Sequence, residues 1–175
     1  MYIEKVWQAA QTYGWDKVLK FDLAVGCSEK EIRNLEEKLG VNLPVAYKEF
    51  LSWAGKGLGE FAVGSEFYYD QDLVDLQRMA KDLLEDNAVP FKLPEDAFVF
   101  WGHQGYQFTF FRTSQGDDPP VHYYLEAAEG EKEEIKWNYH SHFTEFLILR
   151  MKADAEHLEN AKQAEERIAR DWTRD

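Results

Sequence analysis

The sequence predicts an α+β domain in which an antiparallel β-meander is covered on one face by helices and followed by a long C-terminal helix. Two patterns predict this class. Apolar residues recur with helical spacing before residue 90 and after residue 142, whereas between residues 97 and 139 they alternate with polar residues. Short turns containing Gly, Pro or Asp separate the alternating stretches, which is typical of consecutive antiparallel strands.

The N-terminal third is expected to form three helices, the first of them closed by Gly14. Ser28 and Glu31 have the spacing of a capping box, in which each side chain accepts a hydrogen bond from the other residue's backbone amide. Gly40 ends this second helix in the left-handed conformation, and Pro44 suits the first turn of the third. The expected buried stripes are Ile3, Val6, Trp7 and Ala10, then Ile32, Leu35 and Leu39, then Tyr47, Phe50, Leu51 and Ala54.

Between these helices and the meander, the glycines after residue 55 predict a loop and a short strand at 60–63, paired with 66–69. A further helix is expected to be capped by Asp72 with Asp75 and to end near Asn87. Its predicted buried face consists of Leu73, Leu76, Ala80 and Leu83. The meander itself is expected at residues 97–101, 106–111, 121–126 and 135–139.

The last stretch is expected to form a helix that begins near Phe143 and extends beyond the domain. Apolar residues continue at intervals of four and three as far as Trp172, but Asp154 and Glu165 interrupt the seam, so a long coiled coil is not expected. Four alternatives remain open for its far end: a solvated tail, packing back on the domain, contact with a second copy, or contact with a partner. The chain is accordingly expected to be a monomer or a weak homodimer through this helix.

The region 28–55 also carries a family resemblance, because its ordered combination of L-G, L-P, Y-K and F-L pairs resembles the start of a SUKH (SMI1/KNR4) domain. The matching residues are Ser28, Glu31, Ile32, Glu36, Leu39, Gly40, Leu43, Pro44, Tyr47, Lys48, Phe50, Leu51 and Gly55. The stretch from Phe98 to Gly105 resembles the family's strand and glycine-rich turn, although His103 and Gln104 replace the usual glycines and small polar residue. Ser141, Phe143, Phe146 and Leu147 resemble its closing helix.

The resemblance covers about residues 27–150, and it implies a SUKH-like domain over residues 1–150, N-terminal helix included, followed by a helical extension over 151–175. It also implies a function. Many SUKH proteins are bacterial immunity proteins that occlude a cognate polymorphic toxin, commonly a nuclease or deaminase, so stoichiometric binding without turnover is expected. The alternative is an intracellular regulatory or scaffold protein that acts through protein–protein contacts.

Charge and cysteine content indicate the kind of partner and compartment. The chain has 20 basic and 33 acidic residues, a net charge of −13, which disfavours nucleic acid and anionic membrane as partners and favours a basic toxin. The same acidity also serves solubility alone. Cys27 is the single cysteine, and no apolar run has signal-peptide or membrane-spanning character, so a reducing cytoplasm is expected.

The chain offers few residues for catalysis, and it is expected to be non-enzymatic and to need no cofactor or metal. His140 and His142 have ligand-like spacing but stand at a strand-to-helix junction. Cys27 precedes a helix, where a thiol pKa can fall, but a nucleophile also needs a base such as His103 or His122 within reach. An undetected enzyme using these residues is the third and weakest alternative.

The second face of the meander is the expected partner-binding surface, provided that no helix covers it. Aromatic and amide side chains on a rigid sheet with an acidic rim are typical of an interface, although cross-strand packing of a solvated sheet explains the same pattern. The candidate residues are Gln107, Thr109, Phe111, Asp117, Asp118, His122, Tyr124, Glu126, Lys136 and Asn138.

Overall fold

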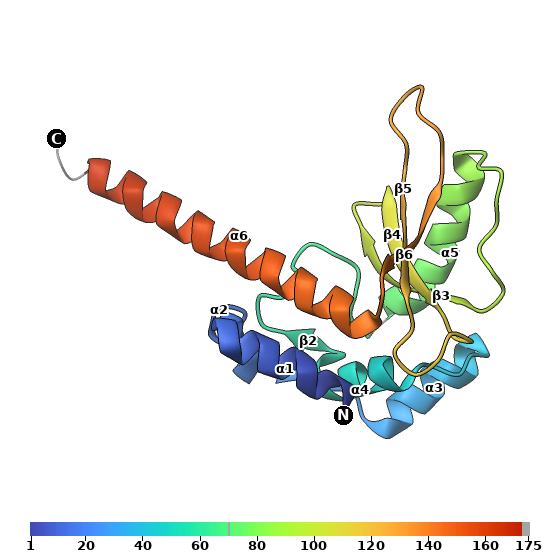
Figure 1. Ribbon diagram of the computed structural model, residues 1–175, viewed down its shortest axis with the longest axis horizontal. Helices are drawn as coiled ribbons and strands as arrows, with labels where there is room; N and C mark the ends of the chain where they lie inside the picture. The colour runs from blue at the N-terminus through green and yellow to red at the C-terminus, as the bar shows by residue number, and fades with distance from the viewer. Residues whose placement is uncertain (70, 173–175) are drawn as a thin grey trace.

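The computed structural model describes residues 1–69 and 71–172 (Figure 1). Its helices are α1 (Tyr2–Tyr13), α2 (Trp15–Val18), α3 (Glu29–Leu39), α4 (Val45–Ala54), α5 (Gln71–Asp86) and α6 (Phe143–Trp172), with a 3-10 turn η1 at Phe21–Leu23. Its strands are β1 (Ala24–Val25), β2 (Gly57–Leu58), β3 (Ala97–His103), β4 (Gln107–Arg112), β5 (Val121–Leu125) and β6 (Ile135–His140). The α+β class is confirmed.

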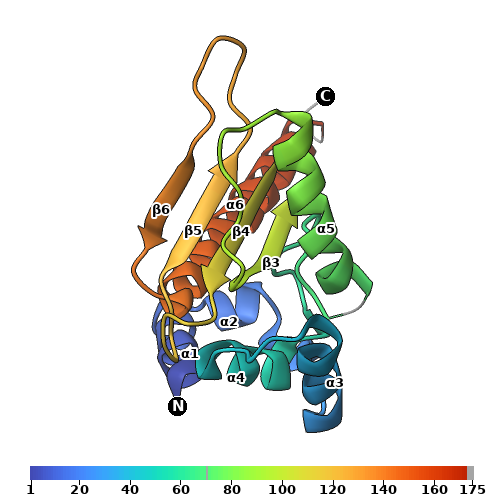
Figure 2. The ribbon, with the colours of Figure 1, turned by 90° about the vertical axis from the view of Figure 1, so that its right-hand side faces the viewer.

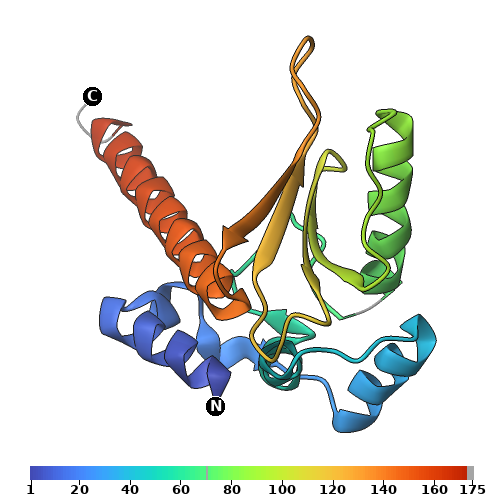
Figure 3. The ribbon, with the colours of Figure 1, turned by 45° about the vertical axis from the view of Figure 1, so that its right-hand side comes forward.

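The last four strands form one antiparallel sheet in the order β3-β4-β5-β6, which confirms the predicted meander. Helices lie on both sides of it. Helix α5 packs along one side, whereas α4 and the start of α6 pack against the other (Figures 2 and 3). We call these the α5 face and the α6 face of the sheet.

Tyr47 of α4 lies at the centre of the core on the α6 face. Its side chain is completely buried, as the predicted stripe of this helix requires. The ring centroid lies 5.4 Å from that of Phe98, and 5.3 Å from those of Phe111 and Phe143. Strand β3, strand β4 and helix α6 therefore all contact this one side chain of α4.

Helix α5 closes the other side of the sheet through an unusual contact with β3. The Gln77 side-chain amide bonds both backbone groups of one residue: its Oε1 accepts from Val99 N at 2.9 Å, and its Nε2 donates to Val99 O. Packing is also close at Gly102, where an added Cβ atom would lie 2.7 Å from the side-chain end of Leu76, at Cδ2. Farther along, Asn87 Nδ2 donates to Tyr124 Oη at 3.0 Å.

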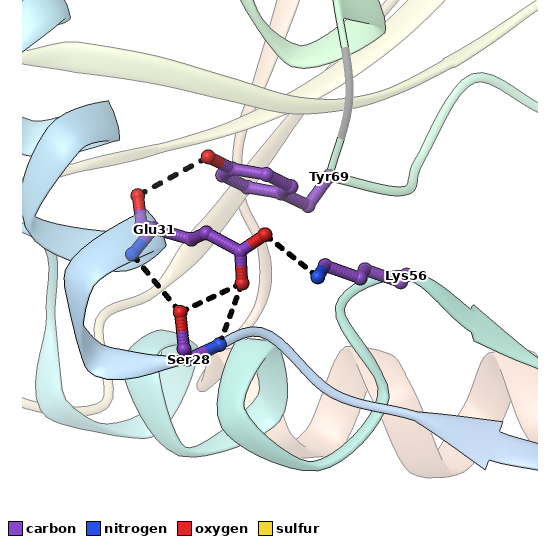
Figure 4. A network of polar contacts seen from close by, with 4 residues as sticks. All are labelled: Ser28, Glu31, Lys56 and Tyr69. Atoms are coloured by element: carbon purple, nitrogen blue, oxygen red, sulfur yellow. Dashed lines mark hydrogen bonds and ion pairs between the residues drawn. The ribbon is translucent and has the colours of Figure 1, made fainter.

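The predicted capping box at the start of α3 is present and belongs to a larger polar network (Figure 4). Glu31 Oε2 accepts from Ser28 N at 2.8 Å, while Ser28 Oγ accepts from Glu31 N. The other carboxylate oxygen lies 2.6 Å from Lys56 Nζ, and Tyr69 Oη donates to the Glu31 carbonyl. The network thus links the N-terminal turn of α3 to Lys56 and Tyr69, which precede and follow the loop of residues 57–68.

The prediction for residues 60–69 is wrong, because residues 60–63 form turns and the short strand of this region is Gly57–Leu58, paired with Ala24–Val25. Ala62 explains the difference, since its φ of 56° is left-handed and its N–H donates to Asp154 on α6. Helix α5 begins at Gln71, so Asp72 lies inside the helix, and its side chain falls outside the described residues. The predicted buried face is present except that Leu84 replaces the half-buried Leu83.

Helix α6 is the long C-terminal helix that the sequence predicts, and it is continuous across the expected boundary at residue 150. Met151 and Ala155 are fully buried against the domain, so its core extends past that boundary. Beyond Ala155 the helix leaves the domain and most of its described side chains are exposed (Figure 1). The side chain of Trp172, expected to continue the apolar seam, lies outside the described residues.

Candidate partner-binding surface

The expected partner-binding residues do not share one face of the sheet. Strands β4 and β5 pair Phe108 with Tyr124 and Phe110 with His122, which places those four side chains together on the α5 face. Gln107, Thr109 and Phe111 alternate with them and therefore lie on the α6 face, opposite Leu125, Tyr123 and Val121. The predicted set is thus split between the two faces, and the expectation of a single binding face is wrong.

Four of the expected residues are also buried, contrary to the prediction of an exposed face. Phe111 and Tyr124 have no exposed surface, and His122 and Thr109 expose 1% and 2%. Neighbouring side chains cover both faces of the sheet at these positions, so the condition of an uncovered second face is not met for these residues.

The buried polar members of this set have bonding partners inside the domain. His122 Nδ1 accepts from Asn138 N at 2.9 Å, and burial lowers the pKa of its imidazole, which is therefore neutral at pH 7. Tyr124 Oη donates to Glu133 Oε2 at 2.7 Å, and burial raises the pKa of this hydroxyl to about 12. Both side chains connect β5 to the segment around β6, which is a structural role.

Asp117 and Asp118 are adjacent, but only one of them supports the fold through its carboxylate bonds to α6. Asp118 accepts from Thr144 N at 3.0 Å and from Thr144 Oγ1 at 2.6 Å, in the first turn of α6. Asp117 is exposed, and its backbone carbonyl accepts from Ala46 N at the start of α4. Asp118 thus satisfies a helix-start amide from a distant loop.

The remaining expected residues keep accessible surface but are scattered. Gln107 is half-buried, while Glu126, Lys136 and Asn138 are exposed. Lys136 Nζ lies 5.8 Å from the centre of the Tyr123 ring, and Asn138 has a φ of 51° at the register shift between β5 and β6. Of the predicted partner-binding residues, these four and Asp117 are therefore the ones with accessible side chains and no structural role described above.

The structure brings together a different site, a groove of about 260 Å³ between the sheet and α6. We call it the sheet–α6 groove. Its lining residues are Trp101, Gln107, Thr109, Tyr123, Tyr139, His140, Phe146, Leu149, Arg150 and Ala153. Sequence reasoning missed it because the angle at which α6 leaves the sheet depends on packing against α1 and α2. No local sequence pattern points to the groove; in the structure, the exposed Tyr139 and Leu149, 54% and 44% accessible, mark it.

A second surface feature is the acidic loop between β5 and β6, residues 126–134, which projects beyond the sheet (Figure 1). It contains one lysine, Lys132, and five glutamates: Glu126, Glu129, Glu131, Glu133 and Glu134. Glu133 is half-buried because it bonds Tyr124 Oη and Ala127 N, and the other four are exposed. The loop therefore has a fixed base and a charged, accessible tip.

The candidate catalytic and metal-binding residues have other roles in the structure. Burial raises the pKa of the Cys27 thiol to about 11, so the thiol is protonated at pH 7 and is a poor nucleophile. His142 Nδ1 lies 3.0 Å from the Asp118 carbonyl, whereas His140 packs on Phe146 with centroids 5.7 Å apart. Throughout the described residues, no group of three or more His, Cys, Asp or Glu side chains is arranged to hold a metal ion.

Comparison with known families is decisive for the fold. The profile of the SMI1/KNR4 family (SUKH-1) matches residues 26–149, which extend from the residue before Cys27 to the second turn of α6. The chain belongs to the SMI1/KNR4 family. This confirms the resemblance drawn from the two-helix motif and the closing helix.

The SMI1/KNR4 match leaves α1, α2 and residues 150–172 of α6 outside the family region. No curated protein matches the chain. Among the residues that the structure describes, no helix is long and apolar enough to cross a membrane.

Proposed function

We propose that this protein is an immunity-type binding module that neutralises a cognate toxin protein by occluding it, without turnover. The observation that carries the proposal is the match to the SMI1/KNR4 family over residues 26–149, because the SUKH proteins it resembles include many immunity proteins. The family match indicates a class of function by analogy. The kind of partner is inferred from the charge of the protein's surface.

The charge distribution supports a basic partner, such as a nuclease or deaminase toxin. The net charge is −13, and the loop at 126–134 concentrates exposed glutamates at the tip of a projecting hairpin. Such a tip attracts a basic protein over distances comparable to the Debye length and speeds encounter more than it slows dissociation.

The experiment that tests this proposal is survival of cells that express the toxin-like domain encoded beside this gene, with and without this chain. We expect rescue together with a one-to-one complex by size-exclusion chromatography with light scattering. No rescue, or no such neighbouring gene, would remove the immunity proposal.

The electrostatic part has its own test. Replacing Glu129, Glu131 and Glu134 by Gln removes three charges from the loop tip, and we expect association to slow several-fold at low salt and little at high salt. The matched control replaces three exposed glutamates at the other end of the molecule, Glu4, Glu29 and Glu37, by Gln. Equal slowing in both triple variants would assign steering to net charge and not to the loop.

A regulatory or scaffold role is the second candidate, and the exposed far half of α6 favours it. Leu158 is half-buried against the domain, but residues 165–170 are exposed on all sides. A regulatory protein would use this segment for a partner or for a second copy. If truncation after Ala161 changes neither the partners captured nor the mass in solution, this candidate loses its support.

A further inference from the structure

The sheet–α6 groove differs in charge from the rest of this acidic protein. The chain carries 33 acidic residues, yet none of the described Asp or Glu residues lines the groove. Arg150 lines it directly, and Lys136 Nζ lies 5.8 Å from the ring centre of Tyr123, another lining residue. Burial lowers the pKa of His140, so this lining residue is neutral at pH 7. The lining therefore contains one cationic side chain, Arg150, which is paired with Asp154 behind it, and no carboxylate.

Arg150 is held in place but has unused hydrogen-bond capacity. Its guanidinium lies 5.4 Å from the Trp101 ring centre, and its Nη2 bonds Asp154 at 2.8 Å. Arg150 Nε and Trp101 Nε1 are buried and have no hydrogen-bond acceptor among the described residues. Buried donors without acceptors are unfavourable. The Arg150 side chain as a whole is 28% exposed and lines the groove, so an acceptor that enters the groove meets this side chain.

The walls of the groove carry accessible apolar surface on both sides. Tyr139 on β6 stacks on Tyr123 with centroids 5.2 Å apart, and Leu149 faces solvent from α6. Tyr and Arg are the side chains that dominate binding energy in protein interfaces. The volume of about 260 Å³ lies below the usual range for cofactors and drug-sized ligands, so the groove fits a single side chain of a partner.

We propose that the sheet–α6 groove anchors the partner protein by receiving one of its Glu or Asp side chains, with the carboxylate on Arg150 and the rest of the side chain between Tyr139 and Leu149. Arginine suits this role because its planar guanidinium pairs with a carboxylate through two parallel hydrogen bonds. The inference rests on the proposed function and deepens it: the acidic loop attracts a basic partner, and the groove selects one carboxylate within it.

The test uses the full chain and two blocked peptides, acetyl-Gly-Glu-Gly amide and acetyl-Gly-Gln-Gly amide. Proton–nitrogen NMR spectra follow the indole N–H signals, and the Trp101 signal is assigned by its loss in Trp101→Phe. We expect the Glu peptide to shift the Trp101 signal in a saturable way and to bind about tenfold more tightly than the Gln peptide, the usual contribution of a charged hydrogen bond.

Two variants locate the binding energy. Arg150→Gln is expected to abolish the preference for the Glu peptide, whereas Arg78→Gln, which changes an exposed arginine on α5, is expected to leave it unchanged. If Arg150→Gln does not fold, the comparison of the two peptides with the native chain still tests whether the groove prefers a carboxylate.

Equal shifts from both peptides, or none from either, would overturn the proposal. A Trp101 signal that moves with protein concentration alone would also overturn it, because a second copy would then occupy the groove. These outcomes do not touch the immunity proposal, since peptide binding is measured without the toxin. Conversely, failed rescue with preserved Glu selectivity would remove the toxin and leave the carboxylate site.

Discussion

Asp118 is expected to be one of the most important surface carboxylates for stability, and Asp118→Ala tests this. The substitution removes both acceptors of Thr144, whose side chain is 95% buried, and leaves its amide and hydroxyl without protein partners in the first turn of α6. Losing a helix-start acceptor costs about 0.5–2 kcal/mol. Losing the favourable interaction of the carboxylate with the helix dipole adds about 0.3–1 kcal/mol.

We therefore expect the free energy of unfolding to fall by about 2 kcal/mol in Asp118→Ala, measured by urea denaturation. For a chain of this size, that corresponds to a decrease in Tm of about 4–8 °C. The matched control is Asp117→Ala, whose exposed carboxylate interacts with the Tyr2 hydroxyl at the surface and is expected to matter by less than about 0.5 kcal/mol. If the two variants unfold within about 0.5 kcal/mol of each other, the carboxylate bridge to α6 does not stabilise the protein as reasoned.

Three further predictions concern helices α3 and α4. Glu31→Gln is expected to destabilise the protein fully above pH 4.5 and progressively less as the pH falls toward 2, because bonds from Lys56 and then Ser28 lower the pKa of Glu31 from 4.5 to about 2. Urea midpoints of the variant and the native chain across this pH range measure the effect, and a constant difference between them would contradict it. Tyr47→Phe is expected to stabilise the protein by about 1 kcal/mol in urea, because the buried hydroxyl has no partner among the described residues; destabilisation would reveal a hidden acceptor. Gly55→Ala is expected to lower the free energy of unfolding by about 1–3 kcal/mol in the same assay, because the new Cβ would lie 2.6 Å from Cys27 Sγ and from Leu51 O. An unchanged urea midpoint would show that the neighbouring atoms move aside without cost.

The parts of the fold that sequence predicts well are those fixed by neighbouring residues. The capping box at Ser28 and the left-handed Gly40, with φ of 66°, depend on contacts within a few residues. Strand positions likewise follow from alternation, and β3 to β6 begin and end within about two residues of the expected ranges. The failure at residues 60–63 has the opposite cause, since Ala62 is fixed by Asp154, which lies 92 residues away.

The candidate site could not be predicted because alternation sets which residues share a face within a strand but not between strands. The pairing of Phe110 with His122 depends on the intervening loop of residues 113–120. That pairing placed His122 and Tyr124 on the opposite face from Phe111. The groove depends in addition on the direction of α6, which no local pattern encodes. The acidic loop, by contrast, is encoded locally, as a run of glutamates within residues 126–134.

The clamp of Gln77 on Val99 has a consequence for self-association of the sheet. An edge strand with free backbone groups invites another chain to add a strand. At the β3 edge, Gln77 occupies both groups of Val99, and the Glu66 backbone exchanges hydrogen bonds of 3.0 and 2.9 Å with Gly102. The β6 edge is guarded less completely, by the exposed Lys136 and the irregular Asn138. When the protein is partly unfolded or concentrated, fibrillar contacts are therefore expected to begin at β6, and a proline placed in that strand would be the natural way to prevent them.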